Sequence, residues 1–96
     1  MSSGKSGSPG KTALVTGAAA RIGAAIAEVL HQRGCAVAVH CNSNKDGAEA
    51  LAERLNAARS GSAFVVQADL SQPAGIEQLA AQLRSKWERL DVLVNN

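Results

Sequence analysis

The segment Thr16–Gly23, with the sequence TGAAARIG, has the residue types and spacing of a phosphate-binding turn. It follows a short apolar run and leads into a stretch with helical periodicity. Gly17 permits a tight turn, and Gly23 allows the helix to pack closely against the strand before it. The free N–H groups and the dipole at the start of a helix favour a phosphate charge. We therefore predict that this segment holds the pyrophosphate of a dinucleotide. An ordinary strand-to-helix turn made of small residues is the other interpretation.

The end of the second apolar run indicates which dinucleotide is preferred. Enzymes that use NAD usually carry an acidic residue there, which binds the ribose 2′-hydroxyl. In this chain the stretch Val39–Lys45 (VHCNSNK) contains no acid, and the first one is Asp46. A carboxylate would repel the 2′-phosphate of NADP, whereas amide, hydroxyl and ammonium groups can donate to it. We therefore predict NADP, as NADPH, ahead of NAD, with a polar loop that binds no ligand as the alternative. The predicted donors are Asn42, Ser43, Asn44 and Lys45.

These two segments require a regular scaffold, and the rest of the chain predicts one. Apolar runs alternate with stretches of helical periodicity. The predicted strands are Thr12–Thr16, Cys35–His40, Ser62–Ala68 and Asp91–Val94. The predicted helices are Arg21–Arg33, Asp46–Ala58 and Pro73–Arg89. Because the strands are continuously apolar, both of their faces should be covered. The order β-α-β-α-β-α-β then predicts an α/β fold with a Rossmann-type parallel sheet, truncated after the fourth strand.

Periodicity and end signals predict how the helices pack and where they stop. Gly34 lies where a glycine commonly ends a helix, and Ser71 is a predicted N-cap with Pro73 in the first turn. We expect His40 to end its strand as a half-buried histidine with its hydrogen bonds satisfied. The predicted apolar faces are Ile22, Ile26, Val29 and Leu30 in the first helix, Ala48, Leu51, Ala52 and Leu55 in the second, and Ile76, Leu79, Ala80, Leu83 and Trp87 in the third.

Composition and charge exclude several classes of protein. The net charge of +2, without a basic block, gives no argument for nucleic acid or an anionic membrane surface. No apolar run approaches the roughly 18 residues of a membrane span. Residues 1–10 (MSSGKSGSPG) are expected to form a flexible leader. A P-loop is not predicted in this region. Gly4 and Gly10 are separated by five residues, whereas a P-loop requires four, and no strand precedes them.

The two cysteines, Cys35 and Cys41, lie within one predicted strand. At ~3.3 Å per residue they would be roughly 20 Å apart, whereas a disulfide requires Cα atoms within about 7 Å. We therefore predict free thiols, which suit a reducing, cytoplasmic location. Without paired histidine or cysteine ligands, no metal site is predicted.

Three segments resemble the short-chain dehydrogenase/reductase family. TGAAARIG resembles its TGxxxGxG fingerprint, and Asp69-Leu70-Ser71 resembles its acidic turn after the third strand. Val92–Asn96 (VLVNN) resembles the start of its NNAG element on the fourth strand. The matches lie on the expected elements in the expected order. The resemblance implies that residues 11–96 are the N-terminal, dinucleotide-binding half of a Rossmann domain.

The resemblance also implies roles for individual residues. Gly17, Arg21, Ile22 and Gly23 would lie at the cofactor, Asp69 would contact the adenine ring with Leu70 packed near it, and Asn95 would line the cleft and hydrogen-bond across the sheet. Arg21 replaces the middle glycine of the fingerprint, as in the pteridine reductase branch, where this arginine lies beside the pyrophosphate and the pterin pocket. A surface arginine at a helix start, a turn-forming aspartate and an ordinary strand end are the alternative interpretations of Arg21, Asp69 and Asn95.

The family's catalytic residues are not expected in this chain. That chemistry uses a tyrosine acid assisted by a lysine, and the chain contains no tyrosine. We therefore predict no catalytic residue here. The full parent would reduce a pterin or a carbonyl with NADPH and, like the family, form a homo-oligomer. A noncatalytic nucleotide-binding or interaction module that pairs with full-length subunits, and a flavodoxin-like domain without a nucleotide, are the alternatives.

Overall fold

Four parallel strands form a single sheet in the order β3-β2-β1-β4. The structure is a computed structural model that describes residues 10–96, so the predicted leader, apart from Gly10, lies outside the described residues. The strands are β1 (Thr12–Val15), β2 (Ala36–Cys41), β3 (Ala63–Gln67) and β4 (Val92–Val94). The helices are α1 (Arg21–Gln32), α2 (Lys45–Ala58) and α3 (Pro73–Lys86). The predicted Rossmann-type order of elements is confirmed, with boundaries that differ by one to three residues at most ends.

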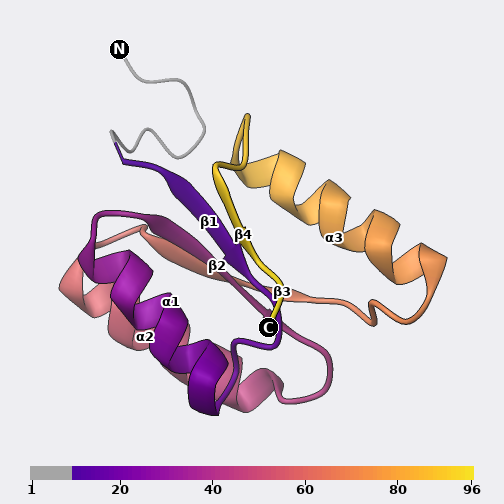
Figure 1. Ribbon diagram of the computed structural model, residues 1–96, viewed down its shortest axis with the longest axis horizontal. Helices are drawn as coiled ribbons and strands as arrows, with labels where there is room; N and C mark the ends of the chain where they lie inside the picture. The colour runs from indigo at the N-terminus through magenta and orange to yellow at the C-terminus, as the bar shows by residue number, and fades with distance from the viewer. Residues whose placement is uncertain (1–9) are drawn as a thin grey trace.

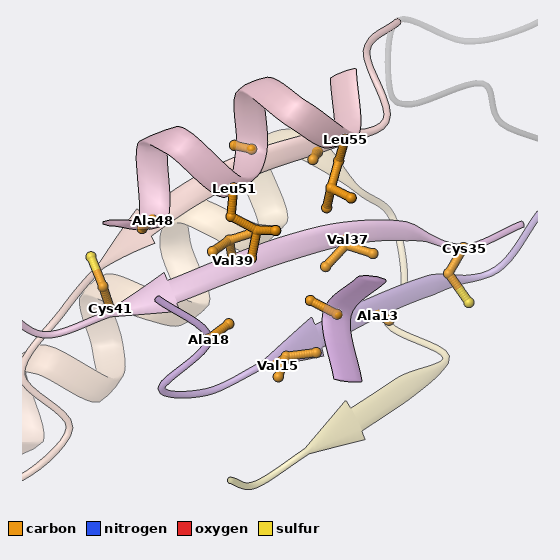
Figure 2. Packing of buried hydrophobic residues seen from close by; sticks show 13 residues of the cluster. Ala13, Val15, Ala18, Cys35, Val37, Val39, Cys41, Ala48, Leu51 and Leu55 are labelled. Carbon is orange, nitrogen blue, oxygen red and sulfur yellow. The ribbon is translucent and has the colours of Figure 1, made fainter. Parts of the chain in front are cut away.

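The helices cover both faces of the sheet, α1 and α2 on one side and α3 on the other (Figure 1). Successive side chains of a strand point to opposite faces. In β1, Ala13 and Val15 join the core under α1 and α2, whereas Leu14 joins the core under α3. Figure 2 shows the first core, in which Leu51 and Leu55 of α2 pack onto β2. This two-sided burial explains why the strands are continuously apolar.

The predicted apolar face of α1 is only partly correct. Ile26 and Leu30 pack against the core, but Ile22 and Val29 are 69% and 49% exposed. The residues that α1 buries are Gly23, Ala27 and His31. Small side chains at the first two of these positions let the helix axis approach the sheet, which rotates the larger side chains outward. In α3, Ile76 was likewise predicted to face the core and is 54% exposed.

The predicted first residue of α3, Pro73, is confirmed, but the predicted N-cap and the predicted last residue are wrong. The N-cap is Gln72, not Ser71, because the amide and the hydroxyl of Ser71 both donate to Asp69 Oδ1. The helix ends at Lys86 rather than Arg89. Trp87 has extended backbone angles and is buried, with its ring edge-on to Phe64 at 5.0 Å between centroids. If α3 continued through Trp87, the chain would not turn back toward β4.

Two further predictions can be compared directly. Cys35 and Cys41 are buried free thiols, as expected from their separation. Within residues 10–96, none of the helices is long and apolar enough to cross a membrane. β4 forms one edge of the sheet, with Leu93 exposed.

A polar cluster holds the edge of the sheet where the strands begin. His31 Nε2 lies 2.6 Å from the hydroxyl of Ser62, which itself donates to the Arg59 carbonyl. The guanidinium of Arg59 donates to the carbonyls of His31 (3.1 Å) and Cys35 (2.7 Å). Burial, assisted by the charge of Arg59, lowers the pKa of His31 below its ordinary value of 6.5. The cluster therefore ties the ends of α1 and α2 together around a histidine whose neutral form is favoured.

This cluster should make the fold sensitive to acid. A histidine whose pKa is lower in the folded state contributes stability that is present above its unfolded pKa and is lost as the pH falls through its folded pKa. The free energy of unfolding should therefore decrease below pH ~6.5. Denaturant titrations between pH 8 and 5 should show a steeper decrease for the unsubstituted chain than for His31→Gln. The other histidine, His40, is common to both proteins. Parallel curves would contradict the assignment.

Candidate functional site: the loops at the carboxyl ends of the strands

All four strands are parallel, so their carboxyl ends lie along one edge of the sheet. The three helices begin at this edge, and their first turns face the connecting loops. In open α/β sheets, ligands bind outside the carboxyl ends of the strands. Every residue predicted to bind cofactor lies in these loops, in the first turn of α1 or α2, or directly after β4. The fold therefore gathers these candidates along one edge.

The first loop is fixed through its backbone by β2. Gly17 has a φ of 60°, a conformation that favours glycine, so the predicted tight turn is present. Its N–H donates to His40 Nδ1 (3.0 Å), and the N–H of Ala18 donates to the His40 carbonyl (2.8 Å). The other ring nitrogen, Nε2, lies 2.9 Å from the carbonyl of Ala68 after β3. His40 is buried rather than half-buried, and its ring links the loop after β1 to the loop after β3.

Gly23 provides close packing, as predicted, and does so against two partners. A Cβ atom there would lie 2.3 Å from the Gly17 carbonyl oxygen and 2.7 Å from Asn96 Nδ2. That Nδ2 donates to the Gly17 carbonyl at 3.0 Å. Asn96, which follows β4, thus contacts the first loop and holds it in place. No side chain can stand at position 23 without displacing this contact.

Asn95 makes the predicted contact across the sheet. The hydroxyl of Thr16, at the end of β1, lies 3.3 Å from both Asn95 Oδ1 and the Val94 carbonyl, either of which can accept its proton. The same hydroxyl accepts from the N–H of Asn96 at 3.0 Å. These bonds fix the start of the first loop relative to β4. Whether Asn95 touches a cofactor remains a prediction.

Arg21 has an unusual backbone for its residue type. It opens α1 with a φ of 59°, and it is the single non-glycine residue with a positive φ among those described. Its side chain is exposed, and within residues 10–96 it has no hydrogen bond or ion pair. The first turn of α1 contains no acidic residue. A strained backbone that presents an unpaired cation at the positive end of a helix is the arrangement expected where an anion binds.

The segment predicted to bind the 2′-phosphate leads directly into α2. Asn44 is the N-cap, and its Oδ1 accepts from the N–H of Gly47 at 3.0 Å. Asn42, Ser43, Asn44 and Lys45 are all exposed. Lys45 Nζ lies 3.9 Å from Glu49, a solvent-exposed pair that contributes little and can be exchanged for a phosphate. The side chains of Ser43 and Lys45 are thus available to a ligand, while the Asn44 oxygen is used by the helix.

The loop after β3 presents a carboxylate. Asp69 Oδ1 accepts from the hydroxyl (2.6 Å) and the amide (3.0 Å) of Ser71, and these bonds lower the pKa of Asp69. The turn-forming role that was the alternative for Asp69 is therefore present. Leu70 is half-buried against the core under α3. The adenine contact of both residues remains a prediction.

Sequence reasoning predicted that His40 has its hydrogen bonds satisfied, which is confirmed, but it missed the role of His40 in linking loops and missed Asn96 as a contact of the first loop. Both are polar residues directly after or at the end of an apolar strand, and this was the only signal available for them. Their importance comes from long-range hydrogen bonds, which local patterns do not predict. Among the described residues, no group of three or more His, Cys, Asp or Glu side chains is arranged to hold a metal ion. The edge combines the first turn of α1, an unpaired arginine and a close-packed glycine turn.

The fold and this edge define a dinucleotide-binding α/β protein, and sequence comparison specifies the family. Residues 11–96 match the model of the short chain dehydrogenase family. The chain belongs to this family of oxidoreductases, whose members bind nicotinamide dinucleotides. The resemblance inferred from the three motifs is confirmed.

Individual relatives match about nine tenths of the chain. An uncharacterized oxidoreductase of Methylorubrum extorquens is 49% identical over 87 residues, covering 91% of this chain and 35% of the relative. Pteridine reductase 1 of Leishmania tarentolae is 43% identical over 101 residues, covering 88% and 35%. The 3-oxoacyl-acyl-carrier-protein reductase FabG of Escherichia coli is 39% identical over 87 residues, covering 91% and 34%. The chain spans about a third of the length of these relatives.

Proposed function

We propose that residues 11–96 form the NADP(H)-binding part of a reductase, and that the polypeptide carrying them reduces a pterin or carbonyl substrate with NADPH. One observation carries the proposal. Arg21 stands unpaired, on strained backbone, beside the glycine turn of Gly17 and Gly23. A guanidinium offers several fixed donors to a phosphate and stays charged at all relevant pH values.

The preference for NADPH over NADH is supported by the loop after β2. Ser43 and Lys45 can donate to a 2′-phosphate, and the segment 42–45 places no carboxylate where it would repel one. The nearest acids, Asp46 and Glu49, lie within α2, and Glu49 is the partner of Lys45. Binding of the 2′-phosphate would exchange this exposed ion pair for a stronger one.

A pterin substrate is favoured over a simple ketone by the arginine at position 21. This departure from the family's TGxxxGxG fingerprint is shared with the pteridine reductase branch, and a pteridine reductase is among the relatives. Chemistry at the nicotinamide belongs to residues beyond those described, and the larger protein is proposed to be a homo-oligomer. NADPH oxidation by the whole polypeptide, with a dihydropterin and a 3-oxoacyl thioester compared, separates the two substrate classes.

Titration with NADPH and NADH, followed by fluorescence of the reduced nicotinamide, tests the cofactor assignment. NADPH should bind more tightly than NADH. Lys45→Ala should weaken NADPH binding by about fivefold, because one charge-assisted phosphate contact is lost, and should leave NADH binding nearly unchanged. Lys86→Ala is the matched control, because Lys86 ends α3 at the opposite edge of the sheet. Equal affinities for the two cofactors, with no effect of Lys45→Ala, would refute the proposed preference.

A further inference from the structure

The three helices share a feature in their first turns. The third residue of each one is a glycine: Gly23 in α1, Gly47 in α2 and Gly75 in α3. At each position a Cβ atom would approach a backbone carbonyl oxygen more closely than real contacts allow, at 2.3, 2.8 and 1.8 Å respectively. The first turn of every helix is therefore pressed against the backbone of a loop at the site edge.

Gly47 differs from the other two in the loop that it contacts. Gly23 meets Gly17 and Gly75 meets Asp69, each in the loop that leads into its own helix. The contact of Gly47 is with the carbonyl oxygen of Ala19, which belongs to the loop after β1. Gly47 thus joins the pyrophosphate loop to the neighbouring loop that is proposed to bind the 2′-phosphate.

Hydrogen bonds join the residues of the segment around Gly47 to one another. The N–H of Gly47 donates to Asn44 Oδ1 (3.0 Å), and the N–H of Ala48 donates to the Asn44 carbonyl (3.2 Å). The N–H of Lys45 donates to the carbonyl of Ser43 at 3.0 Å. Any displacement of Gly47 from Ala19 must therefore be shared by Ser43 and Lys45.

We propose that Gly47 is a positioning residue that sets the separation of the two phosphate-binding loops and thereby the preference for NADPH over NADH. The inference rests on the proposed function. The 5′- and 2′-phosphates sit on the same ribose, so their separation is fixed by the nucleotide and the two loops must match it. A methyl group at position 47 would have to displace Ala19 or Asn44, whose Nδ2 would lie 2.7 Å away. Ser43 and Lys45 would then no longer reach the 2′-phosphate while the 5′-phosphate is bound.

Calorimetric titration of the Gly47→Ala variant with two adenosine nucleotides tests this. The probes are 2′,5′-ADP, which carries both phosphates, and 5′-AMP, which lacks the 2′-phosphate. We expect the affinity for 2′,5′-ADP to fall by about tenfold, the scale expected for a displacement below 1 Å at a preorganised site, while the affinity for 5′-AMP changes by less than about twofold. Ala50→Ser, which adds one atom on the exposed side of α2, is the control and should alter neither.

The outcomes separate this inference from the proposed function. If the unsubstituted chain binds neither nucleotide, the proposed function fails and the inference falls with it. If that chain binds 2′,5′-ADP and folded Gly47→Ala binds both nucleotides unchanged, or weakens both equally, only the inference is overturned. If the Gly47→Ala variant does not fold, a measurement on the unsubstituted chain still tests the inference. In an amide NMR titration, 2′,5′-ADP should shift the signals of Gly47 and Ala19 together, with one dissociation constant, and an unresponsive Gly47 would overturn the proposal.

Discussion

The Gly75→Ala variant should be less stable than the unsubstituted chain by about 2 kcal/mol or more, because the new methyl group overpacks a buried site. A Cβ atom there would lie 1.8 Å from the carbonyl oxygen of Asp69 and 2.6 Å from its carbonyl carbon, both backbone atoms that cannot rotate away. Alanine is normally the better helix former by about 1 kcal/mol. The predicted loss is therefore opposite in sign to helix propensity.

Urea unfolding followed by circular dichroism measures the effect, with Ala81→Gly as the control. Ala81 is exposed in the middle of α3, and its replacement by glycine should cost about 1 kcal/mol from propensity alone. The two substitutions exchange the same pair of residue types in opposite directions on one helix, yet both should destabilise. If Gly75→Ala were as stable as the unsubstituted chain, the close approach of α3 to the Asp69 turn would be wrong.

Two substitutions of Arg21 should affect binding alike and stability differently. Both Arg21→Ala and Arg21→Gly remove the guanidinium, so NADPH affinity should fall by roughly tenfold or more in each, since charged hydrogen bonds contribute about 1.5–3 kcal/mol. Only glycine relieves the positive φ, which costs an ordinary residue about 1 kcal/mol. Arg21→Gly should therefore exceed both Arg21→Ala and the unsubstituted chain in stability by about that amount.

Fluorescence titration with NADPH and urea unfolding of the same preparations provide both readouts. Arg33→Ala, at the other end of α1, removes a charge of the same kind away from the site and serves as the control. The dependence of NADPH affinity on salt should also be weaker in both Arg21 variants than in this control. Unchanged affinity in the Arg21 variants would show that the arginine is an ordinary surface residue. Equal stability of the two variants would contradict the strained backbone.

The sequence by itself determined the order of elements and the position of the site. Apolar runs of strand length, separated by helical periodicity, require a parallel sheet covered on both faces, and parallel strands bring their carboxyl ends to one edge. The glycines of TGAAARIG, the missing acid before Asp46 and the VLVNN segment could be read without coordinates because each is a local pattern. Membership of the short-chain dehydrogenase family, confirmed over residues 11–96, was visible in the same patterns.

Only the tertiary structure decided which residues hold the site together. His40 bonds to two loops through its two ring nitrogens, and Asn96 supports Gly17 from the end of β4. The large side chains of Ile22 and Val29 turn outward because Gly23 and Ala27 bring α1 close to the sheet. Such contacts join residues far apart in the chain, so they depend on how closely two elements approach. Periodicity and motif spacing carry no information about that distance, and for this reason the contact between Gly47 and Ala19 became visible only in the folded chain.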